Sequence, residues 1–191
     1  TEVLTRLQSI ERSGYWKKDD CEGIMLWGDA RKQIKKIKTN TFDLIFHDAF
    51  SPQRCPELWS EEFLQNLSKK LSKGGKLITY SRAAAVRASL RRSNLTLKSL
   101  ITNSSSKNNW SNGTVAIKNA GDLYKVPNTL FWTSLSKMEE EHLMTIAAVP
   151  YRDPSGNSSS IEIIRRRLQE QKDSTFLNTN KWKKRWILTK S

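Results

Sequence analysis

The stretch FDLIFHDAFSP, residues 42–52, decides the fold class of this chain. Its first five residues are apolar except for one aspartate, which predicts a strand covered on both faces. The strand ends at a carboxylate, Asp48, followed by an aromatic residue, Phe50, and by Pro52. Asp48 could accept hydrogen bonds from a bound amine, or it could form an Asx-turn with its own backbone. The residue types alone leave both interpretations open.

Strands and helices alternate on both sides of this stretch. Apolar runs predict further strands at 23–27, 76–80, 95–101 and 114–118, the last one antiparallel to the strand before it. Helical spacing predicts helices at the N-terminus, at 30–38, from Ser60 to the Gly74-Gly75 pair, and at 83–92. The Ser/Asn-rich residues 102–113 predict a mobile loop. This alternation predicts an α/β fold with a mostly parallel sheet.

The last third of the chain has a different pattern and predicts a helical extension. One helix is expected at 136–148, and a capping box, Ser159-x-x-Glu162, opens another at 161–172 with Ile161, Ile164 and Leu168 on one face. The tail KWKKRW, residues 181–186, interleaves basic residues with tryptophans. We expect the tryptophans to dock the tail and some of its basic residues to contact RNA. The predicted domains are 1–128 and 129–191.

The charge of the chain favours a polyanionic partner. The formal net charge is +14 and the sequence pI is about 9.9, which indicates nucleic acid first and an anionic membrane surface second. No apolar run is long enough to cross a membrane, and the polar N-terminus does not resemble a signal peptide. The two cysteines suit neither a zinc site nor a disulfide framework. We therefore expect a cytoplasmic protein without a metal site.

Polar residues follow three of the predicted strands. They are Asp29, Asp48 and the pair Ser81-Arg82. If these strands are parallel, the residues converge on one edge of the sheet. Asp29 could instead cap the helix that begins at Ala30. His47 is expected to be packed or on the surface, not catalytic.

Residues 42–90 resemble the methyltransferase domain of MnmC proteins. The resemblance is carried by DAFSP at 48–52, PELW at 56–59, GG at 74–75, TYS at 79–81 and AAVR at 84–87. The ending AAVPYRDPSGNSSSIEIIRRRLQEQKDS, together with WKKRW, resembles an extension found on stand-alone, cyanobacterial-type members.

The resemblance implies a class I, Rossmann-like fold that uses S-adenosylmethionine. The implied reaction methylates the amine of 5-aminomethyl-2-thiouridine at the wobble position of tRNA, downstream of a separate FAD-dependent oxidase. Asp48 would hold the substrate amine. The implied cofactor contacts are Gly28, Asp29, Ala30, Asp48 and Ala49, and the implied substrate contacts are Phe50, Pro52, Ser81, Arg82 and Arg87, with both arginines pointing largely outward.

The chain departs from the family pattern at the cofactor site. It contains no Gly-x-Gly turn, and the strand expected at 23–27 matches the third strand of the family. We therefore expect the C-terminal portion of a methyltransferase, truncated at its N-terminus, with weak cofactor binding and an exposed or abnormally paired edge at 42–46.

Three other functions stay open. An aminopropyltransferase has the same fold but usually carries a second aspartate where Ser51 stands. Another RNA or small-molecule methyltransferase, or a non-catalytic RNA-binding module, would also fit the charge and the fold.

Overall fold

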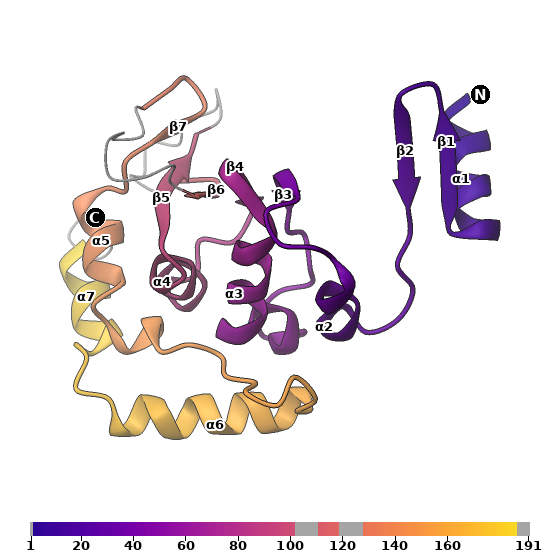
Figure 1. Ribbon diagram of the computed structural model, residues 1–191. Helices are drawn as coiled ribbons and strands as arrows, with labels where there is room; N and C mark the ends of the chain where they lie inside the picture. The colour runs from indigo at the N-terminus through magenta and orange to yellow at the C-terminus, as the bar shows by residue number, and fades with distance from the viewer. Residues whose placement is uncertain (1, 102–110, 119–127, 187–191) are drawn as a thin grey trace. The chain divides into compact units, whose positions relative to one another are not determined.

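The computed structural model describes residues 2–101, 111–118 and 128–186 (Figure 1). The chain forms two compact units, Thr1–Lys36 and Ile37–Ser191, and each is described by itself. The loop predicted at 102–113 falls mostly outside the described residues.

The first unit is a helix, a hairpin and a short helical segment. Helix α1 (Glu2–Ser13) is followed by β1 (Tyr15–Lys18) and β2 (Cys21–Ile24), which pair antiparallel, and then by α2 (Ala30–Gln33) and the 3-10 turn η1 (Ile34–Lys36). The N-terminal helix is confirmed, and the helix predicted at 30–38 is shorter than expected. The position predicted for this strand, 23–27, is wrong, and so is the expectation that it belongs to the mostly parallel sheet. It ends at Ile24, and it pairs with the aromatic strand β1 across a turn at Asp19, whose φ is 52°.

The second unit contains a five-stranded sheet with the order β3-β4-β6-β5-β7. The strands are β3 (Phe42–Phe46), β4 (Leu71–Thr79), β5 (Leu95–Leu100), β6 (Gly113–Lys118) and β7 (Trp132–Thr133). Only β3 and β4 pair in parallel among the described strands, and β6 pairs antiparallel with both β4 and β5. Strands β3, β4 and β5 thus share one direction, with β6 reversed between β4 and β5. The α/β class and the antiparallel strand at 114–118 are confirmed.

Strand β3 lies at the edge of this sheet within the described residues. Phe42, Leu44 and Phe46 alternate along one face and are 39%, 45% and 71% exposed. The expected exposed edge is confirmed, whereas the expected cover on both faces is wrong. Ile45 points to the other face and packs against the core.

Helices α3 (Glu61–Lys70) and α4 (Ala84–Arg92) pack on each other and against one face of the sheet. That face carries Ile45, Leu77, Ala116 and Leu97 in a row across four strands. Burying such side chains stabilises the fold by about 1.5–3 kcal/mol each. The row therefore fixes the register of the strands whose ends carry the candidate site.

The helix predicted to end at Gly74-Gly75 ends earlier, at Lys70. Leu71 already belongs to β4, and the register between β3 and β4 shifts next to the two glycines. Gly74 has φ +79°, and a Cβ on Gly75 would lie 2.9 Å from the Phe42 carbonyl oxygen. The glycines thus permit a bulge inside the strand and do not form a helix cap.

The C-terminal segment belongs to the same unit as the sheet. It contains α5 (Lys137–His142), the 3-10 turn η3 (Ile146–Ala148), α6 (Ser160–Asp173) and α7 (Thr179–Trp186). The single helix predicted at 136–148 is therefore wrong. The capping box at Ser159 is confirmed, and a second one joins Ser136 to Glu139.

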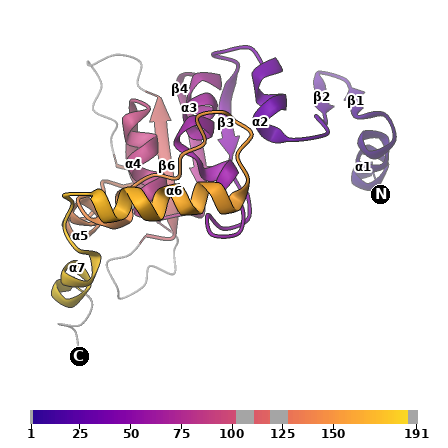
Figure 2. The same cartoon turned by 90° about the horizontal axis from the view of Figure 1, so that it is seen from below.

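Helix α6 runs beneath α3 and α4 in Figure 1 and crosses them in Figure 2. Its packed face is not the predicted one. Ile163 is fully buried, whereas Ile161 and Leu168 are 70% and 53% exposed. The polar neighbours explain the difference, because Ser160 binds Glu57 and Arg167 binds the Val149 carbonyl on the packed side.

Candidate active site

The carboxyl ends of β3 and β4 form one edge of the sheet. The strands are parallel neighbours, and the His47 amide extends their pairing with a 2.9 Å hydrogen bond to the Ile78 carbonyl. Asp48 follows directly. The Tyr80 hydroxyl connects the loop after β4 to the loop after β3 with a 2.8 Å hydrogen bond to the Ala49 carbonyl. We call residues 48–52 and 80–82 the rim.

Buried aromatic side chains hold the first rim loop from behind. The indole N–H of Trp59, a fully buried residue, donates to the Phe50 carbonyl. The His47 ring packs edge-on against Trp59 at 4.4 Å, and its Nε2 donates to the Leu58 carbonyl at 3.0 Å. Burial lowers the pKa of His47 to about 4. His47 is therefore a neutral, packed residue at pH 7, as expected.

The outer surface of the rim combines a carboxylate with aromatic rings. Asp48 is exposed, and Phe50 and Tyr80 are 70% and 46% exposed. Burial raises the pKa of Tyr80, and the charge of Asp48 adds to this effect. The Arg54 guanidinium lies 5.2 Å from the centre of the Phe50 ring. Such a surface can hold an amine at the carboxylate while a flat group stacks on a ring.

The second rim loop presents Arg82 but turns Ser81 inward. Ser81 is 5% exposed, and its hydroxyl oxygen accepts from the Ala83 amide. Arg82 is exposed and donates from Nη1 to the Ser111 carbonyl at 3.1 Å. Pro52 is half-buried at the end of the first loop. The structure thus joins Asp48, Phe50 and Arg82 to one rim, with Ser81 as a supporting residue.

Arg87 is the clearest correction among the predicted site residues. We expected it to point outward, but it is 1% exposed and forms a 2.9 Å ion pair with Glu139, a residue of α5. Burial lowers the pKa of Arg87, and Glu139 opposes that effect. The guanidinium lies behind the rim, because its partners all lie in the interior.

The remaining predicted cofactor contacts lie in the first unit. The Asp29 carboxylate caps α2 by accepting from the Arg31 amide at 2.9 Å. It also forms a 2.8 Å ion pair with the Arg31 side chain, whose hydrogen bonds lower the pKa of Asp29. Gly28 has φ +113°, which favours glycine before this cap. The capping interpretation of Asp29 is confirmed, and the cofactor role of Gly28, Asp29 and Ala30 stays a prediction.

Family comparison decides what kind of site the rim belongs to. A model of S-adenosyl-L-methionine-dependent methyltransferases matches residues 1–117, more than half of the 191 residues. The chain belongs to this methyltransferase family. Its cofactor is therefore S-adenosyl-L-methionine, as the resemblance implied.

Individual relatives place this methyltransferase near the MnmC type. It is 31% identical over 185 residues to an uncharacterized protein of Methanocaldococcus jannaschii, covering 92% of this chain and 48% of that protein. It is 29% identical to the crystal structure of MnmC2 from Aquifex aeolicus, with a TM-score of 0.72, covering 91% of this chain and 51% of that one. The chain thus spans about half the length of these relatives.

A shorter match supports the same assignment. The tRNA 5-methylaminomethyl-2-thiouridine biosynthesis bifunctional protein MnmC of Aromatoleum aromaticum is 38% identical over 66 residues, which are 35% of this chain and 10% of that protein. The resemblance to MnmC-type methyltransferase domains is therefore confirmed.

The described residues have the chemistry for one part of the methyl transfer, which is to hold an amine. The exposed Asp48 carboxylate has the chemistry to hold an amine, whereas the Asp29 oxygens are engaged by Arg31. No group of three or more potential metal ligands occurs among the residues that the structure describes. No helix in the described ranges is long and apolar enough to span a membrane.

Sequence reasoning missed the residues that support the rim. Glu139 carried a visible signal, because Ser136-x-x-Glu139 has the spacing of a capping box. Trp59 and Tyr80 lay inside the quoted motifs, but nothing in their spacing indicated that they hydrogen-bond the Asp48 loop.

Proposed function

We propose that this methyltransferase methylates the exocyclic amine of 5-aminomethyl-2-thiouridine at the wobble position of tRNA, in the cytoplasm. One observation carries the proposal: the exposed Asp48 carboxylate stands beside the exposed rings of Phe50 and Tyr80 at the ends of two parallel strands. The names of the MnmC relatives, which refer to biosynthesis of 5-methylaminomethyl-2-thiouridine in tRNA, the product of the proposed methylation, support the choice of substrate.

Asp48 would position the amine and accept a hydrogen bond from it. S-adenosyl-L-methionine supplies a methyl group activated by its sulfonium. The amine nitrogen must be deprotonated before its lone pair can form the new N–C bond. An exposed carboxylate–ammonium pair is worth only about 0.2–1 kcal/mol, which is less than about one pKa unit of the amine. Asp48 can therefore orient the amine and still let its proton pass to water.

The aromatic rings would orient the base. Phe50 offers an exposed face on which a pyrimidine can stack, and base–aromatic stacking contributes about 1–3 kcal/mol. Pro52 stiffens the loop, and Arg82 supplies an exposed cation at the same rim. By the resemblance, Gly28, Asp29, Ala30, Asp48 and Ala49 would contact the cofactor, with Asp29 at its adenine end.

Helix α7 would contact the tRNA backbone. Trp182 is 5% exposed, stacks on His142 at 4.1 Å and donates to the Met138 carbonyl. The Trp186 indole donates to Glu141. Both indoles face the protein, whereas Lys181, Lys183 and Lys184 are exposed; Arg185 is exposed too but forms a 3.1 Å ion pair with Glu141. Cations fixed on one helix suit electrostatic contact with phosphates.

A comparison of acceptors tests the reaction class. The full-length protein is incubated with S-adenosyl-L-methionine labelled in its methyl group, together with tRNA that lacks the methylation or with a polyamine. Label in the tRNA is the expected result. Label in neither acceptor, with tight tRNA binding, would favour the RNA-binding module. In a separate incubation with decarboxylated S-adenosylmethionine and the polyamine, aminopropyl transfer would favour the aminopropyltransferase.

The proposed substrate already carries an aminomethyl group. We infer that a separate FAD-dependent oxidase exposes this amine before the methyl transfer.

A further inference from the structure

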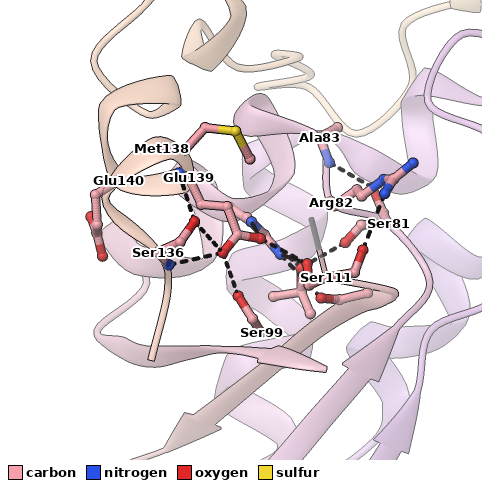
Figure 3. Close-up of polar contacts among 12 residues, drawn as sticks. Ser81, Arg82, Ala83, Ser99, Ser111, Ser136, Met138, Glu139 and Glu140 are labelled. Carbon is pink, nitrogen blue, oxygen red and sulfur yellow. Dashed lines mark hydrogen bonds and ion pairs between the residues drawn. The ribbon is translucent and has the colours of Figure 1, made fainter. Parts of the chain in front are cut away.

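A buried ion pair joins the C-terminal extension to the sheet behind the rim. The side chains of Arg87 and Glu139 are 1% and 2% exposed, and Figure 3 shows Glu139 pointing from α5 toward Ser99 and Ser111. The Glu139 carboxylate accepts hydrogen bonds on both oxygens, from Arg87, Ser99, Ser111 and the amide and hydroxyl of Ser136. The carboxylate is therefore fully paired and cannot rotate without losing partners.

Stability alone does not account for this pair. Replacing a buried ion pair by well-packed apolar residues is often neutral or stabilising. What the pair provides is a fixed geometry, since the guanidinium of Arg87 is planar and its donors point in set directions.

A first chain of hydrogen bonds connects the Arg87–Glu139 ion pair to the rim through Thr114. Arg87 Nε donates to the Thr114 hydroxyl at 2.8 Å, and this hydroxyl donates to the Ser81 carbonyl at 2.6 Å. Arginine cannot accept a hydrogen bond. The single hydroxyl proton of Thr114, a residue with 0% exposure, is therefore committed to Ser81.

A second chain of hydrogen bonds connects Arg87 to the rim through Ser111. Arg87 Nη2 donates to the Ser111 hydroxyl at 2.7 Å, and the carbonyl of the same residue accepts from Arg82 at 3.1 Å. Ser81 and Arg82, two residues of the second rim loop, are thus held by one buried network.

We propose that Arg87 and Glu139 are positioning residues for substrate binding, acting on Ser81 and Arg82 through Thr114 and Ser111. This inference rests on the proposed function, in which Arg82 contacts the substrate. It makes the geometry of the rim depend on α5 of the extension. The effect falls on substrate affinity, because neither residue reaches the outer surface where the amine is held.

Thr114→Val isolates the relay. Valine has nearly the shape of threonine, so the substitution removes both hydrogen bonds of the hydroxyl, the one donated to Ser81 and the one accepted from Arg87 Nε, and leaves the Arg87 Nη1–Glu139 ion pair in place. Ser99→Ala is the matched control, because Ser99 donates to the same Glu139 carboxylate at 2.8 Å, whereas the Thr114 hydroxyl donates to Ser81 of the rim. Thr114→Ser restores the hydroxyl and should behave like the parent protein.

The first readout is hydrogen exchange of the peptide spanning residues 79–84, measured in the full-length protein without substrate. We expect Thr114→Val to speed exchange there about tenfold relative to Ser99→Ala at equal thermal stability. Equal exchange in the two variants would overturn the positioning role. If Thr114→Val does not fold, Thr114→Ala provides the same comparison.

The second readout is methyl transfer. Loss of a binding contact that is equally strong in the ground state and the transition state, here that of Arg82, raises KM for tRNA while kcat stays nearly constant, and we expect about a tenfold rise in KM for Thr114→Val alone. If kcat fell equally in Thr114→Val and Ser99→Ala, the result would contradict the positioning role. If the parent protein transfers no methyl group, the proposed function fails, while the exchange measurement still decides the positioning claim.

Discussion

Asp48 faces solvent, whereas the residues that hold its loop are buried or hydrogen-bonded. The substitution Asp48→Asn keeps the size of the side chain and removes its charge. We expect it to lower kcat/KM for methyl transfer at least about a hundredfold, because the amine is no longer held in line. The affinity for tRNA should stay within about twofold. Filter binding and initial rates measure both quantities.

Asp43→Asn is the matched control for that substitution. The Asp43 carboxylate is exposed and belongs to β3, the strand that precedes Asp48. It is hydrogen-bonded to Ser72, away from the rim. Equal activity of the two variants would show that Asp48 only forms a turn.

The histidines make the stability dependent on pH. Burial lowers the pKa of His47 and of His142 from 6.5 to about 4. Between pH 6.5 and 4 the unfolded chain therefore binds protons that the folded chain does not, so stability falls as the pH falls. We expect the midpoint of thermal unfolding to drop steadily from pH 7 to pH 4.5. His142→Phe should weaken this dependence and keep the stacking on Trp182. A midpoint that is constant across this range would contradict the burial of both rings.

Glu139 also loses stabilisation as the pH falls, but in a lower pH range. Burial would raise its pKa, but Arg87 and the hydrogen bonds of Ser136 and Ser99 outweigh burial and lower it to about 2. Its contribution to stability is present above about pH 4.5 and disappears only as the pH falls through about 2.

At the scale of elements, α7 is the segment whose role is most easily isolated. The double substitution Lys183→Glu with Lys184→Glu keeps both docked tryptophans. We expect it to weaken tRNA binding about tenfold and to reduce the salt dependence of log K by about 1.5. Fluorescence titration at several salt concentrations measures both effects.

Lys69→Glu with Lys73→Glu gives the same change of net charge at exposed positions elsewhere in the unit. It should leave tRNA binding nearly unchanged. If both pairs weaken binding equally, net charge and not α7 is responsible. If the α7 pair affects binding only to vesicles of anionic lipid, the helix contacts membranes and not RNA.

Short sequence motifs predicted where helices begin better than where they end or which of their faces is buried. Ser60 and Ser159 were recognised as helix caps, because a hydroxyl before an acidic first turn acts through a few neighbouring residues. The end of α3 was misplaced, because Gly74-Gly75 serves a bulge that requires the neighbouring strand β3. The buried face of α6 was misplaced because contacts to Glu57 and Val149, distant in sequence, outweigh its apolar stripe.

At the scale of the whole molecule, the sequence predicted the α/β class and the family, since the motifs between residues 42 and 90 follow one another along the chain. The network behind the rim could not be predicted in this way. Arg87 and Glu139 are 52 positions apart, and their pairing depends on how α4, α5 and β6 pack. The place of the strand at 23–27 likewise depends on its partner, because an isolated apolar run does not specify which strand it pairs with.

Residues 1–191 should bind S-adenosyl-L-methionine weakly. Ligand sites usually bury most of the ligand surface, whereas Asp48 and Phe50 lie exposed on an open rim and the chain contains no Gly-x-Gly turn. Isothermal titration of this segment should show no saturation at micromolar cofactor. Micromolar affinity would contradict this prediction and mean that residues 1–191 form a cofactor site by themselves.

The identity of the methylated nucleoside tests the central claim most directly. The full-length protein is incubated with S-adenosyl-L-methionine and tRNA from cells that lack this methylation, and the wobble nucleosides are analysed by mass spectrometry. The account predicts that 5-aminomethyl-2-thiouridine gains the mass of one methyl substitution, and that Asp48→Ala abolishes the gain. A methyl group on any other nucleoside, or an unchanged gain with Asp48→Ala, would contradict it.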